Sequence, residues 1–178
     1  MMEVEIDGTY FSFPESWRVE LFDEWKQYRA LSGAVQLHGC DVVALDDDRL
    51  WLIEMKDYSY PGAREPSSLD DVLIRKAIGT LALLSALGRS QNHSSAQDFS
   101  VASPQAREIY LALHVELPVK RPERAVPGLL MSYQQMMKRA ARRLHLARGL
   151  VTSTLEPQAH TPWTSRRDPD TRIAHLRP

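Results

Sequence analysis

The chain has 178 residues, of which 43% are hydrophobic and 25% charged, and its formal net charge is −1 at pH 7. These values are typical of one globular domain with a sizeable core, and the near-zero charge does not by itself indicate a nucleic-acid partner. No stretch approaches the roughly 20 apolar residues of a membrane-spanning helix, so no membrane contact is expected. The acidic start lacks the apolar segment of a secretory signal, and the single cysteine, Cys40, excludes an internal disulfide. A cytoplasmic protein is therefore expected.

The N-terminal segment predicts a hairpin and then a helix. An Asp-Gly pair at 7–8 divides the short apolar runs of residues 4–13, which is a strong hairpin signal. A helix is expected over 16–31, with a serine at its N-cap and Gly33 as its stop.

The middle of the chain predicts two short strands and a second helix. Residues 40–45 and 50–56 are rich in aliphatic side chains, and an acidic turn joins them. A helix is expected over 69–87, ended by Gly88. Residues 89–105 are polar and rich in serine, and we expect a mobile loop there.

The last third predicts a strand over 109–117, an amphipathic helix over 129–148 and, less firmly patterned, a strand over 150–155. Residues 118–127 form a proline-rich connection. The whole order predicts an α/β fold with a central mixed β-sheet flanked by helices. We expect one domain over 1–155 and a Pro/Arg-rich tail over 156–178, to which no structure is assigned.

The two central strands place three charged residues on one face. A two-residue or a four-residue turn between them gives the same antiparallel register, in which Asp41 lies opposite Glu54. Lys56 is two residues beyond Glu54 and shares its face, with Gly39 opposite.

Paired carboxylates of this kind suit a divalent cation. Asp41 and Glu54 would repel each other, and oxygen ligands with open positions favour Mg²⁺, with Mn²⁺ as a substitute. Such a metal polarises a phosphodiester and lowers the pKa of bound water, and the Lys56 ammonium can orient that water. The competing interpretation is a surface Glu/Lys pair on an exposed strand face.

This arrangement resembles the PD-(D/E)xK nuclease superfamily over residues 16–117. Asp41, Glu54 and Lys56 match its acid and its Glu-x-Lys motif, although Cys40 stands where a proline often precedes the acid. The resemblance implies a restriction-endonuclease-like αβββαβ core, to which the N-terminal hairpin and the C-terminal amphipathic helix are additions. It also implies a Mg²⁺-dependent nuclease of restriction, defence or repair, with the metal held by Asp41, Glu54 and the backbone carbonyl of Met55. DNA is favoured over RNA as the substrate.

Two further charges fall on apolar helix faces. Glu24 lies within the apolar face expected for 16–31, and the superfamily often supplies an extra acid from this helix, which makes Glu24 a candidate. The alternative is a boundary glutamate paired with a nearby cation. Lys76 lies among leucines of the second helix, and we expect it to approach Glu54 or a substrate phosphate. A lysine that extends to solvent is the alternative.

The last helix carries a basic stripe. Lys138, Arg139, Arg142 and Arg143 cover the face opposite its apolar side, which is typical of a solvated helix but could also follow a phosphate backbone. A catalytically silent interaction or nucleic-acid-binding subunit on the same fold is the alternative to a nuclease. A homodimer and a subunit of a larger complex both remain open.

Overall fold

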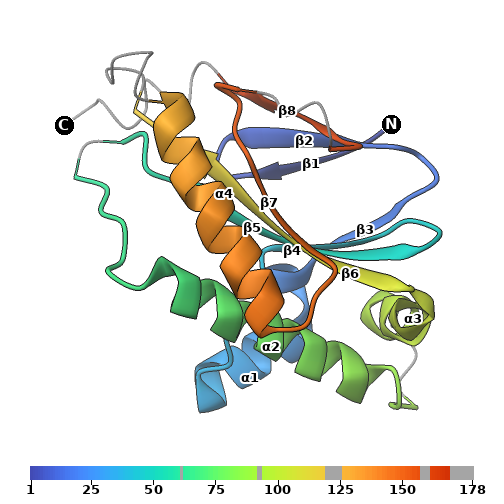
Figure 1. Cartoon of the computed structure of the whole chain (residues 1–178). Helices are drawn as coiled ribbons and strands as arrows, with labels where there is room; N and C mark the ends of the chain where they lie inside the picture. The colour runs from blue at the N-terminus through green and yellow to red at the C-terminus, as the bar shows by residue number, and fades with distance from the viewer. Residues whose placement is uncertain (61, 92–93, 119–125, 157–160, 169–178) are drawn as a thin grey trace.

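The computed structural model describes residues 1–60, 62–91, 94–118, 126–156 and 161–168. It is a mixed α/β structure with two β-sheets (Figure 1). The strands are β1 Met2–Ile6, β2 Thr9–Phe13, β3 Arg18–Leu21, β4 Val42–Leu45, β5 Arg49–Asp57, β6 Glu108–Glu116, β7 Arg148–Thr152 and β8 Thr164–Arg167. The helices are α1 Lys26–Val35, α2 Leu69–Leu87, α3 Ser95–Ala102 and α4 Val126–Arg143, with short 3₁₀ turns η1 Phe22–Glu24 and η2 Ser103–Gln105. Among these, no helix has the length and apolarity to cross a membrane.

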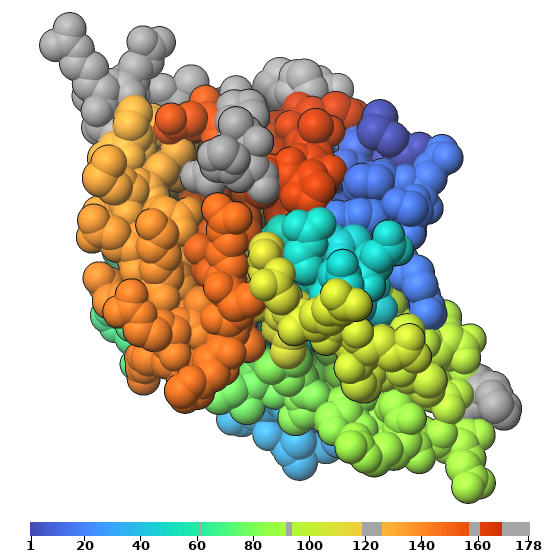
Figure 2. Space-filling model, turned by 45° about the vertical axis from the view of Figure 1, so that its right-hand side comes forward, coloured from blue at the N-terminus to red at the C-terminus, as the bar shows by residue number. Residues whose placement is uncertain are grey.

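The main sheet has five strands in the order β3-β4-β5-β6-β7. β4 is antiparallel to both β3 and β5, whereas β6 is parallel to both β5 and β7. Leu45 pairs with Leu50 and Val42 pairs with Ile53, which is the register predicted from the turn length. The tip of this hairpin contacts the start of β6 through the Arg107 N–H, which donates to the Asp48 carbonyl at 2.7 Å. Figure 2 shows these two segments, in cyan and yellow, side by side on the surface.

The small sheet has the order β1-β2-β8 and lies on one side of the main sheet (Figure 1). Between the two sheets is a core rich in aromatic side chains, which includes Phe11, Trp51 and Trp163. The hairpin predicted over 4–13 is confirmed as β1 and β2. By contrast, β8 lies inside the predicted tail, where no structure was expected, because its pairing with β2 is visible only in the folded chain.

The opposite face of the main sheet is covered by helices α2, α3 and α4, each of which contributes buried side chains to the core on this side. The core on this side includes Leu52 of β5, Leu73 of α2 and Met137 of α4. Gly149 allows α4 to approach β7 closely, because a Cβ there would lie 2.0 Å from the Met137 carbonyl oxygen. Glu54 and Lys56 point to this helix-covered face, since they alternate with Ile53 and Met55, which face the aromatic core.

The predicted helix over 16–31 is wrong for its first half. Residues 18–21 form β3, and the helix begins only at Lys26 and continues through Gly33. Val19 is buried, and β3 pairs antiparallel with β4 along its whole length. This tertiary pairing overrides the local helical pattern.

Two other segments also differ from expectation. Part of the segment 89–105, predicted as a loop, forms α3, whose Ser94 side chain accepts a hydrogen bond from the Gln97 N–H as an N-cap. α4 ends at Arg143, and Gly149, the expected helix stop, lies within β7. Most of the proline-rich connection 118–127 lies outside the described residues. The helix predicted over 69–87 is confirmed as α2 with its predicted bounds.

Candidate active site

The sheet brings the two predicted carboxylates close together, next to the first residue of β4. Asp41 immediately precedes β4 and lies outside the β4–β5 ladder, which ends at the pair Val42–Ile53, and its N–H donates to the Ile53 carbonyl at 3.1 Å, one residue away from the predicted partner Glu54. The Asp41 side chain is fixed as well, because its Oδ2 accepts from the Met55 N–H at 2.7 Å. Glu54 is fully buried.

Two lysines converge on a single oxygen of Glu54. Lys76 Nζ lies 2.5 Å from Glu54 Oε1 and 3.3 Å from Asp41 Oδ1, and Lys56 Nζ lies 2.6 Å from the same Glu54 Oε1. The side chains of Lys56 and Lys76 are only 26% and 17% exposed. A surface pair on an open strand face and a lysine extending to solvent are therefore both excluded, and the predicted approach of Lys76 to Glu54 is confirmed.

Helix α2 also positions the chain just before Asp41. Thr80 Oγ1 accepts from the buried Cys40 N–H at 2.9 Å and donates to the Lys76 carbonyl at 2.9 Å. Gly79 allows this close contact, because a Cβ there would lie 1.9 Å from the His38 carbonyl oxygen. One turn of α2 thus orients Lys76 and at the same time holds the backbone that carries Asp41.

Burial and charge shift the protonation of this cluster. Burial, followed by repulsion from Asp41, raises the pKa of Glu54 to about 7. Burial alone would lower the pKa of Lys76, but the carboxylates of Glu54 and Asp41 hold it above its usual range. Lys76 therefore remains protonated beside Glu54.

The donor groups fit a hard divalent cation. Glu54 Oε2 is buried and accepts no hydrogen bond from any residue that the structure describes. The Met55 backbone faces Asp41, as its N–H shows, and its carbonyl points the same way, because N–H and C=O of one strand residue share a side. Asp41, Glu54 and the Met55 carbonyl are oxygen donors only, which suits Mg²⁺ or Mn²⁺.

The site supplies two carboxylates rather than three. In the described part of the chain, no group of three or more His, Cys, Asp or Glu side chains could hold a metal ion. Mg²⁺ is compatible with this arrangement, since it commonly binds one or two carboxylates and keeps waters or substrate phosphate oxygens as its other ligands.

The extra acid predicted from the first helix is placed differently. Glu24 is exposed on η1, ahead of α1, and is not part of a helix face. The neighbouring Asp23 interacts electrostatically with the cluster, because partial burial and the charge of Asp41 raise the pKa of Asp23. The Phe22 N–H donates to the Asp41 carbonyl at 2.9 Å, which joins this turn to the site. Sequence reasoning missed Asp23 because it assumed a continuous helix.

Tyr58 is a second residue that sequence reasoning missed. It follows Lys56 by two residues, and its hydroxyl is buried without a hydrogen-bond partner among the described residues. Burial, and after it the charges of Glu65 and Glu54, raise the pKa of Tyr58 to about 12. The spacing of Glu54, Lys56 and Tyr58, each two residues apart, was the available signal.

A second buried polar cluster lies on the other face of the main sheet. Both ring nitrogens of His114 are paired, with Thr152 Oγ1 at 2.8 Å and with Glu116 Oε1 at 2.8 Å. Glu116 Oε2 accepts from Thr154 Oγ1 at 2.7 Å, and Arg167 of β8 lies 4.0 Å from the same oxygen. No sequence pattern indicated this cluster, because its members come from three strands.

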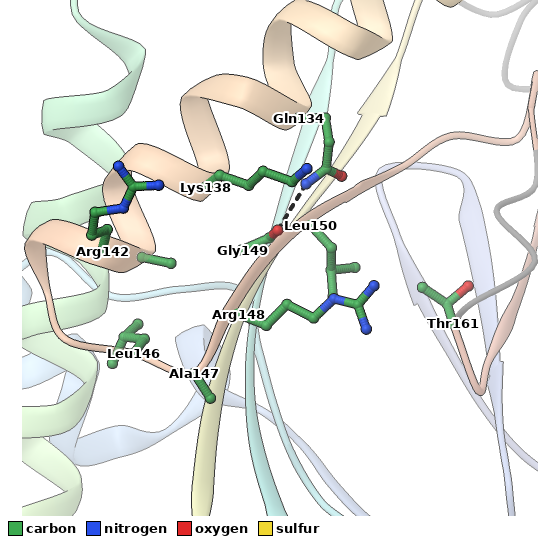
Figure 3. A pocket seen from close by; sticks show the side chains of 10 residues that line it. Gln134, Lys138, Arg142, Leu146, Ala147, Arg148, Gly149, Leu150 and Thr161 are labelled. Atoms are coloured by element: carbon green, nitrogen blue, oxygen red, sulfur yellow. Dashed lines mark hydrogen bonds between the residues drawn. The ribbon is translucent and has the colours of Figure 1, made fainter.

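The basic residues of α4 divide into two groups. Arg143 pairs with Asp71 at 3.2 Å and with Asp70 at 3.8 Å, both on α2, and Arg139 is exposed. Lys138 and Arg142 instead line a surface hollow between α4 and β7 (Figure 3).

Comparisons with known proteins identify one partial match. No family model matches the chain, and no solved structure matches it. A cysteine–tRNA ligase of Neisseria meningitidis serogroup A is 30% identical over 142 residues, which is 61% of this chain. The match covers 20% of that ligase, so the chain spans only about a fifth of the length of this curated relative.

Proposed function

We propose that this protein is a metal-dependent nuclease of the PD-(D/E)xK type, which hydrolyses phosphodiester bonds of nucleic acid. The observation that carries the proposal is the convergence of Asp41, Glu54, Lys56 and Lys76, with one buried oxygen of Glu54 left without a partner. Burying a carboxylate oxygen without a partner is costly, and such a cost is expected at a site that binds a ligand.

The fold supports this assignment and departs from it at one point. Three antiparallel strands, β3 to β5, are followed by α2 and a parallel strand, β6, in keeping with the restriction-endonuclease-like core. The acid precedes the second of these strands and the Glu-x-Lys motif lies on the third. The departure is the position of α1, which lies between β3 and β4 instead of before all three strands.

The residues have distinct proposed roles. Asp41, Glu54 and the Met55 carbonyl would hold Mg²⁺ or Mn²⁺, which supplies charge stabilisation to the phosphate and an acidified water. Lys56 is exposed enough to reach that water and orient it toward phosphorus. Lys76 bridges both carboxylates and fixes their orientation. Asp23 and Tyr58 border the site and would contact it through water or substrate.

The test is a cleavage assay on a substrate panel. Wild type, Lys56→Ala and Glu54→Gln are incubated with plasmid, linear and single-stranded DNA and with RNA, in Mg²⁺, Mn²⁺ or EDTA. Metal-dependent cleavage by the wild type and its loss in both variants is the expected result. The partial match to a cysteine–tRNA ligase is the reason to include tRNA in the panel. Cleavage that persists in Lys56→Ala at the wild-type rate would contradict the assignment.

One observation favours the alternative of a catalytically silent, nucleic-acid-binding subunit. Lys56 and Lys76 already compensate the charges of Asp41 and Glu54, so the cluster is electrostatically balanced by the protein's own residues. Calorimetric titration with Mn²⁺ separates the two functions. A nuclease binds Mn²⁺ through Glu54, whereas a silent subunit shows no binding, with or without oligonucleotide present.

A further inference from the structure

The hollow between α4 and β7 has the size and the charge of an anion-binding site. It encloses about 570 Å³, within the ~300–1,000 Å³ range of ligand sites. Lys138 and Arg142 reach it from α4, and Arg148 reaches it from β7. Of the ten residues that line it, none is acidic. We name it the α4–β7 hollow.

The three cations of the hollow differ from the other basic residues of α4. In the described part of the chain, Lys138, Arg142 and Arg148 form no ion pair, whereas Arg143 of the same helix is held by two aspartates of α2. Lys138 and Arg142 are one helical turn apart, so both project on the same side of α4. Unneutralised cations gathered around a hollow attract an anion more strongly than cations spread over a surface.

The walls of the hollow are fixed in place. Gln134 of α4 donates from Nε2 to the Gly149 carbonyl at 2.8 Å and accepts from the Val151 N–H at 3.0 Å, so it satisfies the outer edge of β7 like an added strand. Figure 3 shows Lys138 beside this Gln134–Gly149 contact and Arg148 pointing toward Thr161. These contacts hold α4 against β7 and so fix the backbone positions from which the three cations extend.

The separation between the hollow and Glu54 can be obtained from the strand pairing. Arg148 pairs with Tyr110, which pairs with Trp51, and Glu54 follows Trp51 by three positions on β5. With strands ~4.8 Å apart and a rise of ~3.3 Å per residue, the Cα atoms of Arg148 and Glu54 are about 14 Å apart. Arg148 shares a face of β7 with Leu150, which packs in the aromatic core, whereas Glu54 lies on the helix-covered face, so a strand that contacts both sites passes around the sheet and spans more than the roughly four charges of the straight line.

We propose that the α4–β7 hollow binds the phosphodiester backbone of the nucleic-acid strand, several nucleotides away from the bond that the Asp41–Glu54 site cleaves. This proposal rests on the proposed nuclease function and names a second contact for its substrate. It replaces the stripe of four α4 cations expected from the sequence with Lys138, Arg142 and Arg148. Free phosphate and free nucleotides share this chemistry, and a separate arm of the experiment distinguishes them.

The experiment measures binding in EDTA, where no cleavage takes place. Fluorescence anisotropy with labelled single-stranded DNA and RNA oligonucleotides compares the wild type with the triple variant Lys138→Ala/Arg142→Ala/Arg148→Ala. The matched control is Arg75→Ala/Arg89→Ala/Arg107→Ala, which removes the same charge from exposed sites elsewhere. We expect the hollow variant to bind about tenfold more weakly, and the slope of log K against log salt to fall by about 2, at ~0.7 per lost contact. The control should keep the wild-type slope.

Two results would overturn the proposal. In one, both triple variants lose affinity equally, which assigns binding to net charge. In the other, inorganic phosphate stabilises the wild type but not the hollow variant, while oligonucleotide affinity is unchanged, which makes the hollow a site for a small anion.

Cleavage is then measured separately. A dinucleotide cannot reach both sites, so its cleavage should be equal in the wild type and the hollow variant, whereas cleavage of long substrates should fall in the hollow variant. Hollow-dependent binding without cleavage of any substrate would refute the nuclease alone. Cleavage combined with hollow-independent binding would refute the hollow alone.

Discussion

The two faces of the main sheet each carry a buried polar cluster, and the two clusters differ in how completely their groups are paired. On the aromatic side, His114 and Glu116 have partners for both ring nitrogens and both carboxylate oxygens. On the helix side, two lysines share Glu54 Oε1 while Oε2 has no partner among the described residues. In the aromatic-side cluster the carboxylate itself is satisfied, and the unpaired atoms are Nε and Nη1 of Arg167, whereas at Glu54 it is a carboxylate oxygen beside partly exposed lysines that has no partner in the described part of the chain, which is the pattern expected of a ligand position. Glu54 and Glu116, on neighbouring parallel strands, thus have opposite expected roles.

The largest expected effect is on cleavage, in a matched pair of buried glutamates. If the proposed nuclease function holds, Glu54→Gln should lower the cleavage rate about 10²–10³-fold or more, because it removes a carboxylate charge from the proposed metal site. Glu116→Gln should leave the rate per folded molecule unchanged. Initial rates on the preferred substrate, normalised to the folded fraction by circular dichroism, check both. Equal losses in the two variants would remove the distinction between the clusters.

The next largest effect is on the stability of the fold, and it concerns the cluster around Glu116. Glu116→Ala should lower the free energy of unfolding by about 3–5 kcal/mol, because His114, Thr154 and Arg167 lose a buried anionic partner. Glu108→Ala, at the exposed start of the same strand, should change it by less than about 0.5 kcal/mol. Urea denaturation measures both.

This stabilisation should also depend on pH. Burial would raise the pKa of Glu116, but hydrogen bonds from His114 and Thr154 hold it below the usual value of 4.5. The folded state therefore favours the ionised form, and the contribution of Glu116 is present above pH 4.5 and lost as the pH falls below it. The stability difference between the wild type and Glu116→Ala should shrink in acid, and a constant difference would exclude an ionised Glu116.

A smaller effect is expected from metal. Mn²⁺ at ~100 times its dissociation constant should stabilise the wild type by about 2.7 kcal/mol, seen as a higher Tm. Glu54→Gln should lose this shift, and Glu116→Gln should retain it. An equal shift in Glu54→Gln would place the bound metal elsewhere in the protein.

The sequence predicted the centre of the site better than its borders. The β4–β5 register and the proximity of Asp41 to Glu54 followed from the period of a strand and the length of one turn, and the contact of Lys76 with both from a cation on a leucine-rich helix face, because these are local patterns. Asp23 and β8 could not be predicted, since they depend on the pairing of β3 with β4 and of β2 with β8. Likewise, α3 buries few apolar side chains, so its polar sequence suggested a loop.

The smallest expected effect concerns the support of the site. Thr80→Val keeps the shape of the side chain but removes the hydroxyl that accepts from the buried Cys40 N–H, and a buried donor without a partner costs about 1–3 kcal/mol. Thr164→Val, at an exposed position on β8, should cost less than about 0.5 kcal/mol.

If Thr80 positions Asp41 through the Cys40 backbone, Thr80→Val should also reduce the Mn²⁺-induced rise in Tm. Thr80→Ser, which retains the hydroxyl, should restore that rise. A stability loss with unchanged Mn²⁺ affinity would limit Thr80 to the fold, and would show that β4 and β5 alone orient the two carboxylates.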